Sequence, residues 1–358
     1  MLKILDKYII KKFLSTFFFM LGVVLLLSMV FDMSDKLSEF LTKGAPFSEI
    51  LGEYYLTFLI HFGNMFSSLI IFLSVIWFTA KMAQDSEIIP ILNSGIQFSR
   101  LLRPYMIGAT VLMLISLSIN HFVAPFSNRV MLDFENRYYR FGVHVENFHA
   151  VFDKNISLNI SNYVSEDNIA NDFTLEKVGK DKKPVYFLKA RTAVNTPGTY
   201  KWRLTDYYER FVGSPNDVVI NGKVKDTVFT FKIDEIAQRE NIAETMSFSE
   251  LKKYIADEKS KGSSFIPEYE IVLYERTSLP FATYVLTIIG LSVSSRRKRG
   301  GVGINIALGL GVIFIYIFTM KVTTVAAIKV GFPTLIAVWF PNVLFGIVAY
   351  FLYRNAKK

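Results

Sequence analysis

Residues Phe13–Phe31, FLSTFFFMLGVVLLLSMVF, contain no Asp, Glu, Lys or Arg. A helix needs about 20 mostly apolar residues to cross a hydrocarbon core roughly 30 Å thick. Five more runs follow, the second of them with Arg103 at its edge: Tyr54–Phe78, Leu102–Phe126, Leu279–Ser295, Ile304–Met320 and Leu335–Leu352. With a hydrophobic content of 51%, they predict an α-helical membrane protein with three spanning helices on each side of a long polar segment.

Basic residues indicate the orientation, because Lys and Arg in short connections stay on the cytoplasmic side. They gather on one side of the predicted spans: Lys3, Lys7, Lys11, Lys12, Lys81, Arg100, Arg103, Arg296, Arg297, Lys298, Arg299, Arg354, Lys357 and Lys358. Both termini are therefore predicted to be cytoplasmic and residues 127–270 periplasmic. The latter hold 21 Lys and Arg against 22 Asp and Glu, a balance of −1, so the remaining +10 of the net charge of +9 lies in the membrane part. The soluble segment offers no basic face for nucleic acid.

The sequence predicts three domains: residues 1–126 with helices one to three, residues 127–268, and residues 269–358 with helices four to six. The middle domain has β-branched runs bounded by turn residues, which favour an antiparallel sheet or sandwich. The expected strands are Ile156–Tyr163, Val185–Ala193, Lys201–Phe211 and Thr227–Ile233. Ser247-Phe248-Ser249-Glu250 fits a capping box at the start of a helix over residues 247–261.

Several kinds of chemistry lack their residues. No Asp or Glu lies inside the six runs, which argues against transport coupled to ions through buried carboxylates. The chain has no P-loop motif, so it is not itself an ATPase. It has no cysteine, and His61 and His121 lack further ligands for a metal. Gly309 and Gly311 are expected to allow close helix approach rather than to bind a ligand.

The connection between the second and third spans is the most informative polar stretch. It predicts a short helix within residues 82–95, in which Ser86 or Asp85 caps the start and Gly95 takes the left-handed stop. Ile88, Ile91 and Leu92 would share one face. Two interpretations stay open at this point: a helix lying on the membrane surface, or a helix docked in a groove of a cytosolic partner.

Two stretches resemble the LptF/LptG (YjgP/YjgQ) permeases of the lipopolysaccharide export ABC transporter. The first is Ser86-Glu87-Ile88-x-x-Ile91-Leu92-x-Ser94-Gly95-Ile96-x-x-Ser99, followed by Leu102 and Pro104. The second is Tyr274-Glu275-Arg276-Thr277-Ser278-Leu279-Pro280-Phe281-Ala282, at the start of the fourth helix, with Arg276 and Pro280 as its family residues. Three segments look more like LptG than LptF: Leu5-Asp6-Lys7-Tyr8-Ile9, Trp202-Arg203-Leu204 and Gly331-Phe332-Pro333.

The resemblance implies a permease subunit without catalysis, which extracts lipopolysaccharide or a related glycolipid from the inner membrane. It implies a second permease, an LptB-type cytosolic ATPase that holds ATP and Mg²⁺, and LptC- and LptA-type periplasmic proteins as partners. It also implies that the middle domain is a β-jellyroll that passes lipid on, and that spans one and five line a lateral opening. The residues of the ATPase-coupling helix would be Ser86, Glu87, Ile88, Ile91, Leu92, Ser94 and Gly95.

One departure from the family concerns the outer end of the first span, where the resemblance implies basic residues suited to lipid phosphates. Lys36 and Lys43 are the candidate headgroup contacts, but Asp32, Asp35 and Glu39 lie among them. The lipid then carries fewer phosphates, a cation bridges them, or the partner permease supplies the charge. Two other functions are weighed as well: an ABC subunit that only transmits movement, and a membrane enzyme acting on lipids. The second lacks convergent acid, base or metal groups.

Overall fold

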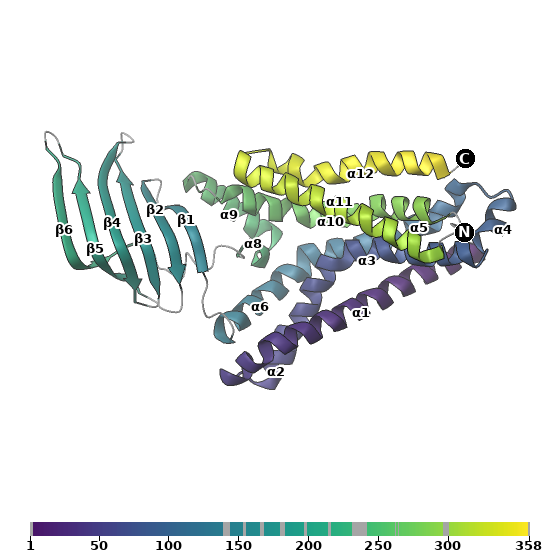
Figure 1. The fold of residues 1–358 in the computed structure, drawn as a ribbon, viewed down its shortest axis with the longest axis horizontal. Coiled ribbons are helices and arrows are strands. Elements are labelled where there is room, and N and C mark those ends of the chain that lie inside the picture. The colour runs from purple at the N-terminus through teal and green to yellow at the C-terminus, as the bar shows by residue number, and fades with distance from the viewer. Residues whose placement is uncertain are drawn as a thin grey trace. The chain divides into compact units, whose positions relative to one another are not determined.

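The computed structural model describes residues 3–138, 144–152, 155–164, 168–179, 183–196, 199–213, 216–230, 242–261, 263, 265–295 and 301–356. The chain forms two compact units, which are Met1–Phe134 with Glu270–Lys358, and Glu135–Tyr269. The first unit is helical, and the second contains a β-sheet (Figure 1).

In the described part of the chain, six helices are long and apolar enough to cross a membrane, as the sequence predicts. These helices are longer than the predicted apolar runs, because each one continues past the stretch that crosses the hydrocarbon core. The second is preceded by the short α2 (Phe47–Glu49), and the second and third continue through π-helical turns. Their bounds are α1 (Ile4–Thr42), η1 (Ile50–Tyr55) with α3 (Leu56–Gln84), α5 (Phe98–Ser118) with η2 (Ile119–Val123) and α6 (Ala124–Tyr138), α10 (Ile266–Ser294), α11 (Gly301–Val330) and α12 (Thr334–Ala356).

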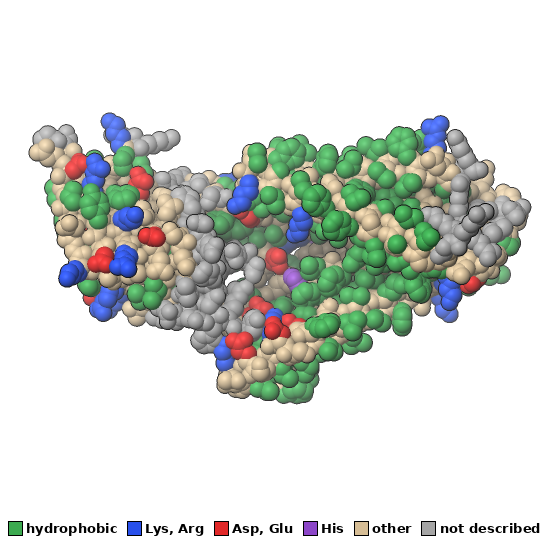
Figure 2. Space-filling view, in the orientation of Figure 1, with side chains coloured by type: hydrophobic (Ala, Val, Ile, Leu, Met, Phe, Trp, Pro, Cys, Tyr) green, Lys and Arg blue, Asp and Glu red, His purple; other side chains and the backbone are tan. Residues whose placement is uncertain are grey.

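The outer surface of the helical unit is apolar. Figure 2 shows hydrophobic side chains over most of its visible face, and exposed Phe19 (71%) and Phe314 (69%) are examples. Contiguous apolar surface of this kind is unfavourable in water and suits contact with lipid. The unit is therefore built to lie in a bilayer.

Inside the helical unit, α3 packs against both α1 and α11, and α11 packs against α12. Gly309 of α11 lies so close to Ile76 of α3 that an added Cβ would clash with the isoleucine side chain, which confirms the predicted close approach. Gly311 has no neighbour within 4 Å of that position, so the prediction is wrong there.

A buried amide joins the last three helices. Asn342 of α12 accepts a hydrogen bond from Tyr316 of α11 at 2.9 Å and donates one to the backbone oxygen of Ser278 in α10 at 2.8 Å. A buried amide is retained at little cost when its donor and acceptor are both used. This residue fixes the register of the second triplet.

The described residues of the second unit form an antiparallel sheet of six strands in chain order, β1 to β6. The strands are β1 (His144–Phe152), β2 (Ile156–Val164), β3 (Ile169–Val178), β4 (Pro184–Asn195), β5 (Lys201–Phe211) and β6 (Val218–Val228). Its buried face includes Phe173, Trp202 and Leu204, with Phe229 packed against it. A helical membrane protein with an inserted antiparallel β domain is confirmed, and the described strands form a meander rather than the Greek-key connections of a strict jelly roll.

Strand prediction succeeded where side chains alternate between buried and exposed. β5 has the predicted bounds, β2 extends the predicted run by one residue, and β4 extends it by three. The strand expected at Thr227–Ile233 overlaps the observed β6 (Val218–Val228) only at its first two residues. Phe229 and Thr230 are not in a strand, and residues 231–233 lie outside the described residues. β6 is largely exposed along its length, and β3 is interrupted by Asp172 at φ +50°. Neither strand therefore alternates cleanly between buried and exposed side chains.

The predicted capping box is confirmed at the start of α9 (Phe248–Lys261), which follows the short α8 (Ile242–Thr245). The Glu250 amide donates to Ser247 Oγ at 3.3 Å, and the Ser247 amide donates to Glu250 Oε2 at 2.8 Å. Two amides that the helix leaves without partners are thereby satisfied.

Candidate functional site

The connection between α3 and α5 begins with a left-handed turn at Ser86, which has φ +61°. The Ser86 amide donates to the oxygen of Ala83 at 3.3 Å, and the Glu87 amide donates to that of Met82 at 2.8 Å. This is the pattern of a Schellman helix end. Ser86 therefore ends α3 and does not cap the next helix, so residues 82–84 of the expected coupling helix belong to α3.

The short helix in this connection is α4 (Ile88–Asn93), about one and a half turns long. Pro90 fits because the first turn of a helix needs no amide donor there. The Ser94 amide donates to the oxygen of Pro90 at 2.9 Å, and Gly95 has φ +81°. The predicted left-handed stop at Gly95 is confirmed.

The apolar side of α4 faces the protein's own helices. Ile88 is fully buried, and Ile91 packs partly buried in the same cluster as Met82 and Phe98. The structure does not describe the Leu92 side chain. Ser86, Pro90, Ser94 and Gly95 are exposed instead. Ile88 and Ile91 therefore hold the turn in place, and the described side chains that remain accessible to another molecule are those of Ser86, Pro90 and Ser94.

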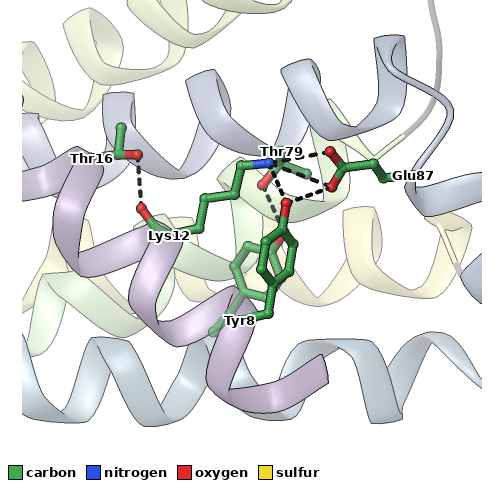
Figure 3. Close-up of polar contacts among 6 residues, drawn as sticks. Tyr8, Lys12, Thr16, Thr79 and Glu87 are labelled. Atoms are coloured by element: carbon green, nitrogen blue, oxygen red, sulfur yellow. Dashed lines mark hydrogen bonds and ion pairs between the residues drawn. The ribbon is translucent and has the colours of Figure 1, made fainter. Parts of the chain in front are cut away.

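Glu87 contacts α1, far away in the sequence (Figure 3). Tyr8 Oη donates to Glu87 Oε2 at 3.0 Å, and Lys12 Nζ donates to Tyr8 Oη at 2.9 Å. Lys12 Nζ also lies 3.4 Å from both carboxylate oxygens of Glu87. The two charged side chains are 25% and 35% exposed, so solvent screens the pair, and it contributes only about 0.2–1 kcal/mol. Its role is to connect α4 with α1 rather than to stabilise the fold.

A stronger ionic contact lies nearby, between the beginnings of α1 and α5. Asp6 accepts two hydrogen bonds from the Arg100 guanidinium, at 2.7 and 2.8 Å, and a third from the Lys3 amide at 2.8 Å. The paired geometry of guanidinium and carboxylate gives direction as well as attraction. Asp6, Arg100, Tyr8 and Lys12 were not predicted as site residues from the sequence. Asp6 was a possible signal, because it is a single acidic residue among the N-terminal lysines.

Aromatic packing holds the N-terminal part of α1 against α3 and α5. The ring of Phe13 lies 5.7 Å from that of Phe78 and 6.4 Å from that of Tyr105. Tyr105 Oη and Thr79 Oγ1, the latter drawn in Figure 3, are 2.9 Å apart. Gly108 makes room for Phe13, because an added Cβ would lie 2.5 Å from the Phe13 ring. Movement of the α3–α5 connection would therefore reach α1 through packed contacts.

The candidate headgroup residues at the other end of α1 are in ion pairs. Lys36 Nζ lies 2.9 Å from Asp32 and donates to Tyr54 Oη at 2.6 Å. Lys43 Nζ lies 3.3 Å from Glu39. Each cation thus has an acidic neighbour one helical turn away.

The family residues of the fourth helix lie within α10. Arg276 is only 6% exposed, and Pro280 lies inside the helix one turn further on. Since proline has no amide hydrogen, Pro280 cannot bond the backbone oxygen of Arg276. Over the residues that the structure describes, no cluster of three or more histidine and acidic side chains could hold a metal ion.

Comparison with known protein families identifies one family. The sequence model of the lipopolysaccharide export system permease LptF/LptG family matches residues 7–355. No individually curated protein gives a significant match. The family match does not distinguish LptF from LptG. Because it covers nearly all of a chain with six spanning helices and an inserted sheet, this protein belongs to the LptF/LptG family of lipopolysaccharide export permeases.

Proposed function

We propose that the chain is a permease subunit of an ATP-driven ABC transporter, which extracts lipopolysaccharide or a related glycolipid from the inner membrane. The glycolipid passes to a periplasmic β-jellyroll bridge towards the outer membrane. The observation that carries this proposal is the family match over residues 7–355. The chain has no P-loop, so ATP and Mg²⁺ belong to a separate LptB-type ATPase, and the chain binds no cofactor of its own.

The other partners follow from the same family. They are a second LptF/LptG-type permease and the LptC- and LptA-type periplasmic proteins. Both termini lie in the cytoplasm and the sheet unit lies in the periplasm. The basic residues of the short connections support this orientation, because they resist translocation.

Force enters at the connection between α3 and α5. The ATPase contacts Glu87 and its exposed neighbours Ser86, Ser94 and Gly95, while Ile88 and Ile91 keep α4 attached to the helical unit. Movement then passes to α1 by two routes, the Glu87 contact with Tyr8 and Lys12 and the pairing of Asp6 with Arg100. In this proposal α1 moves together with the connection between α3 and α5 during nucleotide-driven closure.

Lys36 and Lys43 are headgroup contacts in this proposal only by exchanging partners. Each would have to leave Asp32 or Glu39 for a lipid phosphate. Replacing the carboxylate partner of a lysine by a lipid phosphate costs less free energy than leaving the lysine without an anionic partner, since its charge remains neutralised. Arg276 and Pro280 have a positioning role at the start of the fourth span.

Affinity purification of the full chain from its native membrane tests the proposal. Mass spectrometry of the co-purifying proteins and lipids should find an ABC ATPase, a second permease and a phosphorylated glycolipid. An ATPase without a glycolipid would favour a subunit that only transmits movement. Absence of any ABC ATPase would overturn the proposal, and a modified lipid product formed by the chain alone would favour an enzyme.

A further inference from the structure

The third span is not one continuous α-helix. Between α5 and α6 it passes through the π-helical turn η2 (Ile119–Val123), where the Ala124 amide donates to the oxygen of Ile119, five residues back. A π-turn holds one residue more than an α-helical turn, and such turns are frequent at functional sites. Pro125, the second residue of α6, has no amide and removes a further backbone hydrogen bond. The extra residue turns α6 by about 100° about the helix axis, compared with an uninterrupted α-helix.

The extra residue decides which side of α6 faces α3. Ser127 is 2% exposed and donates through Oγ to the backbone oxygen of Thr57 at 3.4 Å. Beside it, Asn128 Oδ1 lies 3.1 Å from His61 Nδ1. In an uninterrupted helix, Phe126, which is 70% exposed, would take the place of Ser127. The π-turn therefore keeps two polar side chains of α6 on α3 and a phenylalanine away from it.

Side chains enter the backbone hydrogen bonding at η2. Asn120 Nδ2 donates to the backbone oxygen of Ser116 at 2.9 Å, and His121 Nδ1 lies 3.1 Å from the backbone oxygen of Leu117. Asn120 also exchanges two amide hydrogen bonds with Asn64 of α3, at 2.8 and 3.0 Å. Helices bend where a π-turn occurs or where a side chain inserts into the backbone hydrogen bonds, and η2 has both features. The third span is therefore built to bend at this turn.

The two halves of the third span are attached to opposite ends of α1. The pairing of Arg100 with Asp6 attaches α5 to the beginning of α1. The ring of Phe134 attaches α6 to its other end, because it lies 5.2 Å from the ring of Phe40 in α1 and 5.3 Å from that of Tyr54 in η1. An uninterrupted helix would carry any rotation of α5 rigidly into α6. With η2 between them, the two halves can turn separately.

We propose that η2 is a joint at which α5 turns relative to α6 when the connection between α3 and α5 moves. The inference rests on the proposed function, in which nucleotide-driven closure moves that connection. When α5 turns, the pair of Asn120 with Asn64 opens, while Ser127 and Asn128 keep α6 on α3. The helix α1 then pivots about its contact with α6. The half of the third span that continues towards β1 in the chain thus keeps its place while the other half moves.

Distances between spin labels test the joint in the complex reconstituted with the ATPase. The chain has no cysteine, so two introduced cysteines carry the labels. The pair Val111→Cys/Phe126→Cys spans η2, and the matched control Arg103→Cys/Ser118→Cys spans as many residues within α5, with all four positions exposed. Between the nucleotide-free and ATP-bound states, the first distance should shift by at least about 1.5 Å, the rise of one residue, and the control should not.

Equal distances for the first pair in both states, in a complex that contains the ATPase, would overturn the joint. A chain that binds no ATPase would overturn the proposed function and with it the cause of the movement. Copurification of the ATPase therefore separates the two failures.

A deletion tests the joint without the ATPase. Removal of Phe122, which is 78% exposed, takes the extra residue out of η2 and should make the third span a continuous α-helix with Ser127 still on α3. The control Phe122→Ala removes the same side chain and keeps the π-turn. In the full chain in detergent, the Val123 and Ala124 amides should exchange hydrogen severalfold more slowly in the deletion variant than in the control. Equal exchange rates would overturn the proposal. A lower melting temperature of the deletion variant would also overturn it, because η2 would then serve packing alone.

Discussion

Arg100 donates two parallel hydrogen bonds to Asp6, which joins the beginning of α5 to the beginning of α1 across 94 residues of sequence. The Asp6 side chain is 4% exposed, so its carboxylate depends on this partner. A point charge cannot reproduce the two-pronged geometry of a guanidinium. The pair therefore sets where the beginning of α1 meets the beginning of α5, just after the connection that contains α4.

We expect Arg100→Ala to lower the melting temperature of the full chain in detergent by several degrees, because it leaves a buried carboxylate without its main partner. Arg100→Lys should recover only part of the loss. Lys12→Ala serves as the control, since its pair with Glu87 is long and screened, and it should change the melting temperature little. If Arg100→Lys has the same melting temperature as the unmodified chain, the paired geometry of the guanidinium is not required.

Glu87→Lys should weaken association with the partner ATPase about tenfold or more, because it reverses a charge at the contact. The matched control is Asp85→Lys, which reverses an exposed charge just before Ser86. The double variant Lys12→Glu/Glu87→Lys restores the pair with α1 but not the charge offered to the ATPase. Binding and ATP turnover of the reconstituted complex measure both effects, and unchanged transport by Glu87→Lys would refute the role of this residue.

Removal of the capping hydroxyl in Ser247→Ala should destabilise the start of α9 by about 1 kcal/mol, since the Glu250 amide loses its acceptor. Hydrogen exchange of the first-turn amides in the full chain should accelerate roughly fivefold. Ser260→Ala removes a hydroxyl that bonds the oxygen of Asp257 at the other end of the helix, so it should leave those amides unchanged. Equal acceleration of amide exchange in both variants would mean that loss of either serine hydroxyl, rather than loss of the cap, causes the effect.

Acid should loosen the pairing of β5 with β6. The Arg203 guanidinium, which bonds Asp226 at 2.8 and 3.1 Å across the two strands, holds the pKa of that carboxyl below its ordinary value of 3.8. A lowered folded-state pKa contributes stability above the ordinary value, and that contribution is lost as the pH falls through the lowered one. Amide exchange along β6 should therefore rise below about pH 4, relative to Asp226→Asn, which has no such carboxyl. Identical acid profiles for the two proteins would exclude a contribution from this pair.

A reporter fused after Lys358 should behave as cytosolic, and one inserted between Pro197 and Gly198 should behave as periplasmic. Both expectations rest on the basic residues of the short connections. A phosphatase that is active only in the periplasm and a fluorescent protein that is active only in the cytosol report the two sides. Phosphatase activity at the C-terminus would invert the proposed topology.

The sequence predicted the candidate site well in kind and poorly in detail. The short helix and its left-handed stop at Gly95 were predicted because a helix between two spans has local signals, whereas the coupling role of Glu87 stays a prediction. The burial of Ile88 was not found, since an apolar face has the same pattern whether it packs on its own chain or on a partner. Ser86 was assigned to the wrong helix for a similar reason, because a serine between two helices suits the end of one and the start of the next.

The sequence by itself determined the six spans, the inserted sheet and the capping box of α9. Each depends on the composition of a short stretch, and a bilayer requires nothing more of a helix than length and apolarity. Only the tertiary structure decided that Tyr8 meets Glu87, that Gly309 rather than Gly311 admits another helix, and that Phe13 packs against Gly108. These are relations between segments far apart in the chain. They are set by the packing of whole helices, which no local pattern contains.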